Sequence, residues 1–219
     1  MAKAQVLKFF LWLLSSPIII LSYVYELIMP KSIQLDLENC LSSIDNSEQL
    51  PAIFVLALIT AEDHRSEFHP GIDPLAIFRS FLVKLKRGKW QGASTIEQQY
   101  VRIVTNRFER TGARKLREQV LAVMLSRRIS KYCIASSYLS KAFYGTEFIG
   151  LKGLRSEFGD DLFNVSFNEA LRMMVQLKYP RPRTPSLEWY KKNTRRLNII
   201  IKRIEKNPHH ITTKKIRIT

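Results

Sequence analysis

An uncharged apolar run near the N-terminus constrains this chain more than any other feature of its sequence. Residues Phe9 to Tyr25, FFLWLLSSPIIILSYVY, contain no charged side chain. Together with its apolar neighbours, the run approaches the roughly 20 residues that a helix needs to cross a bilayer. Lys3 and Lys8 precede it, and lysines of this kind remain on the cytoplasmic side. The sequence therefore predicts a cytoplasmic tip and transmembrane anchor over residues 1–29.

Two other interpretations of this run are less well supported. A cleavable signal peptide is disfavoured by Pro17 within the apolar run and by the lack of a small-residue cleavage site after it. A buried core helix is disfavoured because the run is apolar on every side and terminal. We therefore expect a single-pass protein of the inner (cytoplasmic) membrane, with the rest of the chain on the periplasmic or extracellular side.

The charge of the chain is large and uneven. The formal net charge is +16, although residues 31–83 carry a balance of −5. Residues 84–131 carry +10 and residues 178–219 carry +11. Basic segments suit anionic lipid, phosphorylated substrates or nucleic acid. Since the predicted anchor places them outside the cytoplasm, no nucleic-acid partner is expected.

The cysteines and histidines of the sequence predict neither a disulfide scaffold nor a metal site. The two cysteines, Cys40 and Cys133, lack the spacing of a metal or redox motif, and two thiols are too few for a disulfide scaffold. The histidines also lack ligand spacing, so we expect no metal site built by the protein itself.

Helical periodicity dominates the remainder, and no strong alternating strand pattern occurs. We expect a polar connector over residues 30–50, a catalytic domain over 51–204 and a basic tail over 205–219. Apolar or amphipathic patterns predict helices over residues 51–64, 94–103, 113–129, 138–144, 168–177 and 187–204. Ser94 is the expected N-cap of the second of these. The fold class predicted is all-α.

Two groups of polar residues suit work on a sugar. Glu62 follows an apolar helix beside Asp63 and suits a general base or acid. The structural alternative is a helix that simply leaves the core at Glu62. Hydroxyl and amide groups that can bind sugar hydroxyls and phosphate oxygens follow at Ser94, Thr95, Gln98 and Gln99. Their structural alternative is an ordinary N-capped helix.

A third group is cationic. Basic side chains surround Glu118 in the sequence at Arg102, Arg110, Arg114, Lys115 and Arg117. Arg114 and Glu118 can pair on one helix face, and paired guanidinium donors suit a pyrophosphate. The alternative is a solvated basic face. Taken together with the anchor, the three groups fit glycosyl transfer from a lipid-linked pyrophosphate sugar.

These blocks resemble the peptidoglycan glycosyltransferases of family 51 that polymerise lipid II, both the monofunctional enzymes and the glycosyltransferase domain of penicillin-binding proteins. The resemblance covers about residues 50–204. Five motifs appear in order: Glu62-Asp63 with His69, Gly71 and Asp73; Gly92 with Ser94-Thr95-Ile96 and Gln98-Gln99; Arg114-Lys115 with Glu118; Tyr138-Leu139 with Tyr144-Gly145; and Glu169-Ala170.

The resemblance implies a lysozyme-like all-α domain. It implies that Glu62 and Glu118 are the catalytic glutamates, with Glu62 deprotonating the acceptor hydroxyl. The attack would invert the anomeric carbon and release undecaprenyl pyrophosphate. Asp63, the hydroxyl and amide group, Lys115 and the arginines would bind substrate. A divalent cation, Mg²⁺ or Mn²⁺, at the pyrophosphate is the one cofactor left open.

The expected partners are lipid II, the growing glycan strand, the membrane and cell-wall synthesis proteins. The sequence departs from the family pattern at several positions, among them Glu97, where a threonine is usual, and Ser126, where a glutamate is common. Two alternatives follow: a catalytically weak scaffold that binds lipid-linked glycan, and a lytic enzyme that cleaves glycan strands. Retention of both glutamates opposes the first, and the cationic cluster opposes the second.

Overall fold

The computed structural model describes residues 2–206 and confirms an all-α fold. In this part of the chain ten α-helices accompany one short 3-10 helix and one two-stranded sheet. The chain divides into two compact units, formed by Met1–Asn46 with Arg65–Ile134 (unit 1) and by Ser47–His64 with Ala135–Thr219 (unit 2). Most of the predicted basic tail, residues 207–219, lies outside the described residues.

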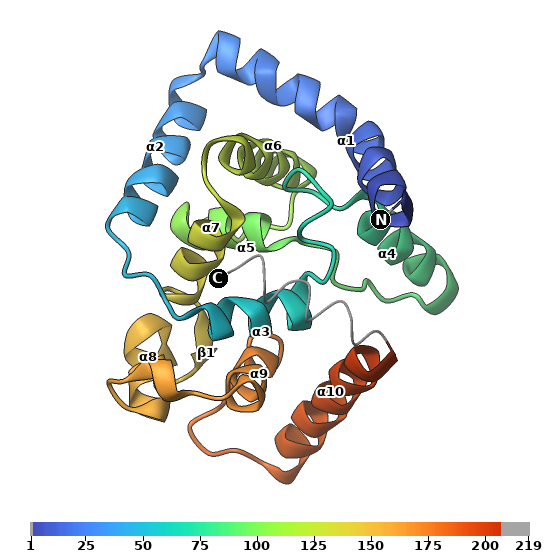
Figure 1. The fold of residues 1–219 in the computed structure, drawn as a ribbon. Helices are drawn as coiled ribbons and strands as arrows, with labels where there is room; N and C mark the ends of the chain where they lie inside the picture. Colours follow the sequence, from blue (N-terminus) through green and yellow to red (C-terminus); the bar gives the residue numbers. More distant parts are fainter. Residues whose placement is uncertain (1, 207–219) are drawn as a thin grey trace. The chain divides into compact units, whose positions relative to one another are not determined.

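Helix α6 (Gly112–Arg128) is the centre of unit 1. It packs against α1 (Ala2–Ile28), α2 (Lys31–Asp45) and α5 (Ile96–Val104), and Figure 1 shows α1 and α2 running around it. The residues of α6 from Val120 to Leu125 are buried on all sides. Gly71 lies against its backbone at φ +106°, and a Cβ there would approach the Ala122 carbonyl oxygen to 2.6 Å. Only glycine fits this approach.

Helix α1 is long and apolar enough to cross a membrane, as the sequence predicts. The second half of α1 nevertheless packs against α6. Glu26 pairs with Arg127 at 2.7 Å and with Arg128 at 2.9 Å, and the Arg127 guanidinium lies 3.8 Å from the centre of the Tyr23 ring. This part of α1 is therefore held against α6 by ionic and cation–π contacts.

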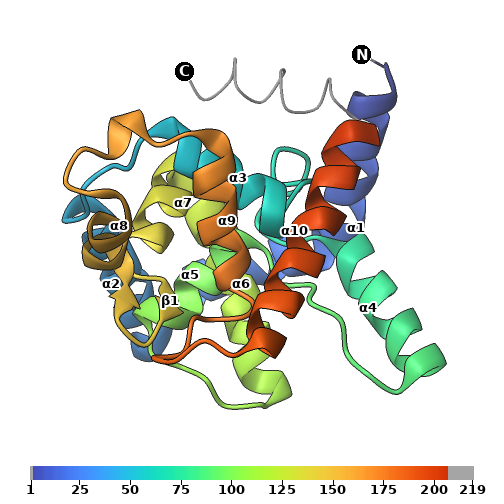
Figure 2. The same cartoon turned by 90° about the horizontal axis from the view of Figure 1, so that it is seen from below.

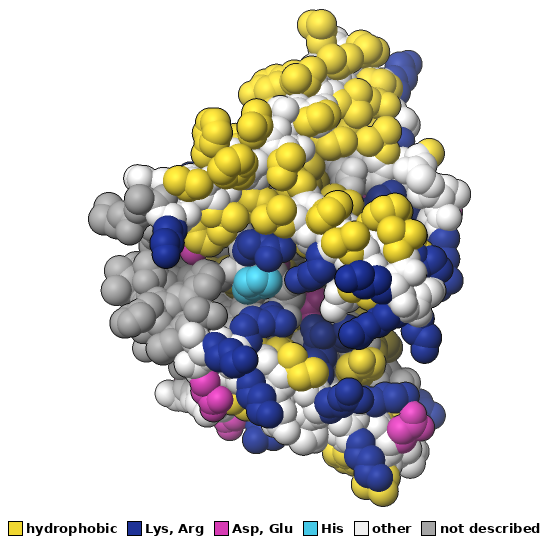
Figure 3. All heavy atoms as spheres, turned by 90° about the vertical axis from the view of Figure 1, so that its right-hand side faces the viewer, with side chains coloured by type: hydrophobic (Ala, Val, Ile, Leu, Met, Phe, Trp, Pro, Cys, Tyr) yellow, Lys and Arg dark blue, Asp and Glu magenta, His cyan; other side chains and the backbone are white. Residues whose placement is uncertain are grey.

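Helix α4 (Pro74–Arg87) follows the first motif, where the sequence patterns predict no helix. Asp73 caps it by accepting a hydrogen bond from the Ala76 amide at 2.9 Å, and Pro74 occupies its first turn. Its outer face exposes Phe78, Phe81 and Leu85. Figure 3 shows hydrophobic side chains gathered over α1 and α4 on one face of the molecule.

Helix α2 replaces part of the predicted connector. Its residues Ile33, Leu37 and Cys40 are buried at helical spacing, although its exposed side is polar enough to hide that pattern. Buried Asp36 accepts hydrogen bonds from Arg107 at 3.1 Å and Arg117 at 2.7 Å. Burial, helped by Asp36, raises the pKa of the Cys40 thiol to about 12, so this cysteine is chemically inert at neutral pH.

In unit 2 the central element is α3 (Ala52–Glu62), whose residues Phe54 to Ala61 are all buried. It packs against α9 (Phe167–Gln176), which in turn packs against α10 (Leu187–Lys206), as Figure 2 shows. Ser166 and Glu169 form a capping box at the start of α9. Glu169 of the fifth motif therefore has a structural role.

The predicted helix over residues 138–144 is wrong beyond Leu139. Helix α7 (Lys131–Leu139) ends there, and β1 (Phe143–Gly145) pairs with β2 (Phe148–Ile149) in an antiparallel hairpin. Gly145 allows the Arg181 backbone to pair alongside, because a Cβ there would lie 2.5 Å from the Arg181 carbonyl oxygen. Helix α8 (Gly150–Phe158) and the 3-10 helix η1 (Leu162–Asn164) follow.

Candidate functional site

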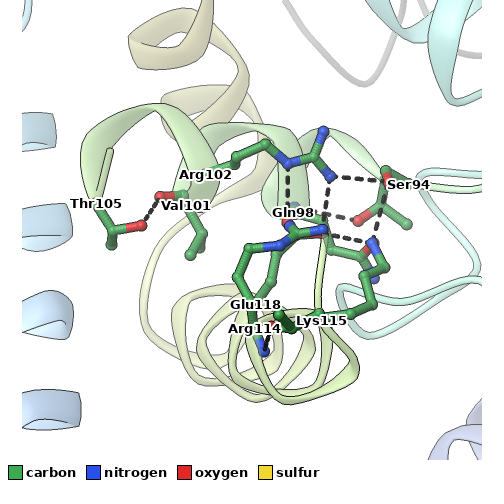
Figure 4. Close-up of polar contacts among 10 residues, drawn as sticks. Ser94, Gln98, Val101, Arg102, Thr105, Arg114, Lys115 and Glu118 are labelled. Atoms are coloured by element: carbon green, nitrogen blue, oxygen red, sulfur yellow. Dashed lines mark hydrogen bonds and ion pairs between the residues drawn. The ribbon is translucent and has the colours of Figure 1, made fainter. Parts of the chain in front are cut away.

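Three members of the cationic group, Arg102, Arg114 and Lys115, converge on Glu118 in unit 1, as Figure 4 shows. Arg102 donates to the Glu118 carboxylate through Nε at 2.9 Å and through Nη2 at 3.1 Å. Arg114 and Lys115, one turn before Glu118 on α6, donate to the same carboxylate. The Glu118 side chain is only 3% exposed. We refer to Glu118, Arg102, Arg114 and Lys115 as the Glu118 cluster.

Hydroxyl and amide groups from the second motif support this cluster. The Ser94 hydroxyl accepts hydrogen bonds from Arg102 at 3.2 Å and from Lys115 at 3.1 Å. The Gln98 side-chain oxygen accepts a further bond from Lys115 at 2.7 Å. Gln98 is fully buried, so its contact is with the protein.

The electrostatics of the Glu118 cluster favour an anion. Three cationic side chains surround one carboxylate, which leaves an excess of two positive charges. Burial lowers the pKa of Lys115, against the opposing effect of Glu118, and the two arginines lower it further. A pyrophosphate could offer several oxygens to these partly exposed donors.

In this structure the Glu118 carboxylate holds the three cationic side chains in place. Both of its oxygens accept hydrogen bonds from Arg102 and from a second cationic side chain, with Lys115 on one oxygen and Arg114 on the other. Such a buried carboxylate orients the cations and limits the repulsion among them. A direct catalytic role for Glu118 remains a prediction.

The remaining residues of the second motif hold the local fold. The N-cap of α5 is Thr95, so the prediction of Ser94 is wrong by one residue. The Thr95 hydroxyl accepts from the Gln98 amide at 3.3 Å and donates to the Gly71 carbonyl at 2.7 Å. Ser94 is instead engaged by the cations. Gln99 is partly buried on α5.

Two predicted arginines lie outside the Glu118 cluster. Arg117 turns toward α2, where it binds Asp36 and donates to the Ser32 hydroxyl at 3.2 Å. Arg110 is exposed in the segment between α5 and α6. The Arg117 guanidinium is engaged by Asp36 and Ser32, whereas the Arg110 guanidinium forms no ion pair or hydrogen bond with the described residues. Substrate binding by either arginine remains a prediction.

Glu62 lies in unit 2, at the last residue of α3. Its side chain is 17% exposed, and its Oε1 atom accepts a hydrogen bond from Arg196 of α10. The second carboxylate oxygen accepts no hydrogen bond from the described part of the chain. Asp63 is buried immediately after it, as the C-cap of α3.

Sequence reasoning missed three ionic partners. In the sequence Arg196 is one charge among many in a basic helix, and nothing near it points to Glu62, 134 residues away. Asp36, the partner of Arg117, lies in the segment predicted as a connector. Glu97, one of the departures from the family pattern, is 1% exposed and pairs with Lys131. Its burial explains why it needs a cation.

Comparison with known proteins gives one consistent result. The family model described as Transglycosylase matches residues 35–205. Penicillin-binding protein 1A of Aquifex aeolicus is 31% identical over 159 residues, which are 72% of this chain and 22% of that protein. Penicillin-binding protein 1B of Vibrio cholerae is 32% identical over 161 residues, 71% of this chain and 21% of that protein. Penicillin-binding protein 1A of Escherichia coli is 33% identical over 159 residues, which are 72% of this chain and 19% of that protein. The chain thus spans about a fifth of the length of these curated relatives.

Proposed function

The chain belongs to the transglycosylase family, and from this we propose that it is a peptidoglycan glycosyltransferase that polymerises lipid II into glycan strands. Its all-α fold is of the lysozyme-like kind that this family shares. The observation that carries the proposal is the Glu118 cluster, where three cations gather on one buried carboxylate. That arrangement fits a reaction with a pyrophosphate leaving group.

Arg102, Arg114 and Lys115 would bind the pyrophosphate of the donor. As the glycosidic carbon–oxygen bond to the pyrophosphate breaks, negative charge grows on the departing oxygens. Donors already oriented by Glu118 can stabilise this charge without reorganising, and stabilisation of this kind commonly lowers the barrier more than any other effect in an active site. Undecaprenyl pyrophosphate would then leave.

Glu62 would supply the base. The hydroxyl of the acceptor sugar transfers its proton to the free oxygen of the Glu62 carboxylate while its own oxygen attacks the anomeric carbon of the growing strand. The new glycosidic bond forms on the face opposite the leaving pyrophosphate, so the configuration inverts. The contact with Arg196 would hold the carboxylate in one orientation for this step.

A divalent cation does not fit the donor set of the Glu118 cluster. The carboxylate there already accepts from three cationic side chains, and the excess charge is positive. We therefore propose that the guanidinium groups and Lys115 themselves neutralise the pyrophosphate, in place of Mg²⁺ or Mn²⁺.

Membrane anchoring by α1 is part of the proposal. Its length and apolar composition suit a bilayer, and anchoring would hold the active domain beside a lipid-linked substrate. The positive-inside rule supports a cytoplasmic N-terminus and a domain on the periplasmic or extracellular side. Cell-wall synthesis proteins remain proposed partners.

The test is incubation of the purified full chain with labelled lipid II. We expect polymer from the wild type and a loss on the order of 100- to 10,000-fold in Glu62→Gln, because a general base contributes about that much. Glu205→Gln, an exposed glutamate on α10, is the matched control. Both variants should keep the thermal unfolding midpoint of the wild type.

Other outcomes point elsewhere. Binding of lipid II without any product would indicate a scaffold, and cleavage of preformed strands would indicate a lytic enzyme. If Glu62→Gln retains activity within tenfold of the wild type, Glu62 is not the base.

A further inference from the structure

A cleft in unit 1 lies beside the end of the membrane-spanning helix. It is formed by the last turn of α1, the start of α2, the segment before α6 and the first half of α6. Figure 1 shows the corner between α1 and α2 at which the cleft lies. Its volume of about 570 Å³ is within the range of ligand-binding pockets. All the described residues that line it belong to unit 1.

Part of the cleft wall is apolar. Tyr25 comes from α1, Ile33 from α2, and Leu116 and Val120 from α6. Leu116 and Val120 are four residues apart, so they lie on the same face of the helix. Leu116 is 39% exposed, and water covers this apolar surface unless a ligand lies on it. The cleft therefore offers a place for a hydrocarbon group.

The rest of the wall is cationic. The lining includes three arginines, and Glu109 is the one acidic side chain among the described residues of the lining. Arg107 and Arg117 both donate through Nε to the buried Asp36 carboxylate, at 3.1 Å and 2.7 Å. Since two guanidinium groups share this one carboxylate, their charges are only half balanced. The cleft therefore favours an anion over a neutral molecule.

Arg107 is the side chain with donors to offer. Its Nε atom is held by Asp36, which fixes the plane of the guanidinium group. Its Nη1 and Nη2 atoms donate no hydrogen bond to any described residue, and the side chain is 39% exposed. Arg117, by contrast, directs its Nη donors to Ser32. The four N–H groups on the two Nη atoms of Arg107 form a planar fork that suits the oxygens of a phosphate.

We propose that this cleft binds one anionic phospholipid of the bilayer that α1 crosses. The phosphate would bind the Arg107 guanidinium, and an acyl chain would cover Leu116 beside Tyr25. The place of the cleft selects this ligand. Tyr25 lies in the last turn of α1, where a spanning helix meets the headgroup layer and where tyrosine is common. The proposal rests on the membrane anchoring of the proposed function.

The lipid-linked substrate is the competing occupant, because Arg114 borders both this cleft and the Glu118 cluster. Arg107 separates the two possibilities. It is bound to Asp36 and forms no hydrogen bond with any member of the Glu118 cluster. A change at Arg107 should therefore weaken binding of a phospholipid and leave binding of the substrate lipid intact.

Native mass spectrometry of the full chain, released from neutral detergent micelles, tests the proposal. The probes are dioleoylphosphatidylglycerol, dioleoylglycerol (which lacks the phosphate) and undecaprenyl phosphate. We expect the wild type to retain phosphatidylglycerol about tenfold more tightly than dioleoylglycerol, since a hydrogen bond to a charged group contributes about that factor. Arg107→Ala should remove this difference and leave the binding of undecaprenyl phosphate unchanged. Arg107→Lys should recover only part of the loss, because lysine keeps the charge without the fork.

Two further variants complete the test. Arg183→Ala removes an exposed arginine of unit 2 and the same unit of charge, so it should bind phosphatidylglycerol as the wild type does. Leu116→Gln should weaken phosphatidylglycerol and dioleoylglycerol alike, because both carry the acyl chains. Arg107→Ala should fold, since Arg117 still pairs with Asp36, and a thermal unfolding midpoint checks this.

The inference is overturned if phosphatidylglycerol and dioleoylglycerol bind the wild type alike, or if Arg107→Ala and Arg183→Ala behave alike. It is also overturned if Arg107→Ala weakens undecaprenyl phosphate as much as phosphatidylglycerol, which would give the cleft to the substrate. Polymerisation of lipid II is measured separately. A protein that makes polymer without this lipid pattern keeps the proposed function and loses the cleft assignment. A protein with the pattern but no polymer keeps the cleft and loses the proposed function.

Discussion

At the scale of single residues, Lys115 is a member of the Glu118 cluster whose proton affinity differs from that of a free lysine. Burial lowers its pKa, so it loses its proton at a lower pH than a free lysine. In the window between the lowered pKa and the ordinary value of 10.5, the unfolded chain binds more protons than the folded one. The folded state is therefore stabilised as the pH rises through that window, while deprotonation of Lys115 removes one positive charge from the Glu118 cluster.

Lys115→Arg should consequently extend activity to higher pH. Arginine stays charged throughout, so the alkaline fall of kcat/KM should begin at a higher pH in Lys115→Arg than in the wild type. The measurement is a pH profile of polymerisation from pH 7 upward. Identical alkaline limbs would show that Lys115 does not set the upper limit.

Arg196 is the second residue with a specific expected effect. Arg196→Ala should lower kcat by about 10- to 100-fold with little change in KM, because a misplaced reacting group costs about that much. Arg196→Lys should recover part of the loss. Arg195→Ala, next to it and exposed on the same helix, is the control. A faster enzyme in Arg196→Ala would mean that the ion pair restrains the base.

At the scale of elements, the ion pair between α5 and α7 carries a stability prediction. Lys131→Met leaves the Glu97 carboxylate buried without its cation, which should reduce the free energy of unfolding by about 3–5 kcal/mol. The double variant with Glu97→Gln should be less destabilised, because no charge is then left alone. Denaturant unfolding measures both. A loss below about 1 kcal/mol in Lys131→Met would mean that Glu97 finds other compensation.

Helices with a strong apolar pattern could be predicted from the sequence, and short or polar ones could not. The apolar run before Glu62 and the spacing of Val120 and Met124 predict α3 and α6 correctly. Helix α2 was missed because its buried residues are few, and the hairpin at Phe143 was missed because two short strands have no periodicity to detect.

The same distinction holds for the candidate site. Arg114, Lys115 and Glu118 are neighbours on one helix, so helical geometry alone brings them together. Arg102 contacts them from α5, and its spacing from Glu118 in the sequence does not predict that contact. The Glu62–Arg196 contact depends on how α10 packs in unit 2, and no local pattern encodes that packing.

At the scale of the whole molecule, the charge of +16 favours an anionic membrane even without the anchor. Removing residues 1–29 should leave a protein that binds anionic vesicles and is released by added salt, since each basic residue at such a surface contributes about 1 kcal/mol. Vesicle sedimentation measures this, with neutral vesicles as the control. No binding to anionic vesicles at low salt would restrict membrane attachment to α1.

The distance in sequence between Glu62 and Arg196 has a consequence for synthesis. Residues 52–62 leave the ribosome long before Arg196 is translated. Until α10 has emerged and packed on α9, the Glu62 carboxylate lacks the group that orients it. A nascent chain should therefore carry its complete cationic cluster while still lacking an oriented base, and activity should arise only as the last helix joins its unit.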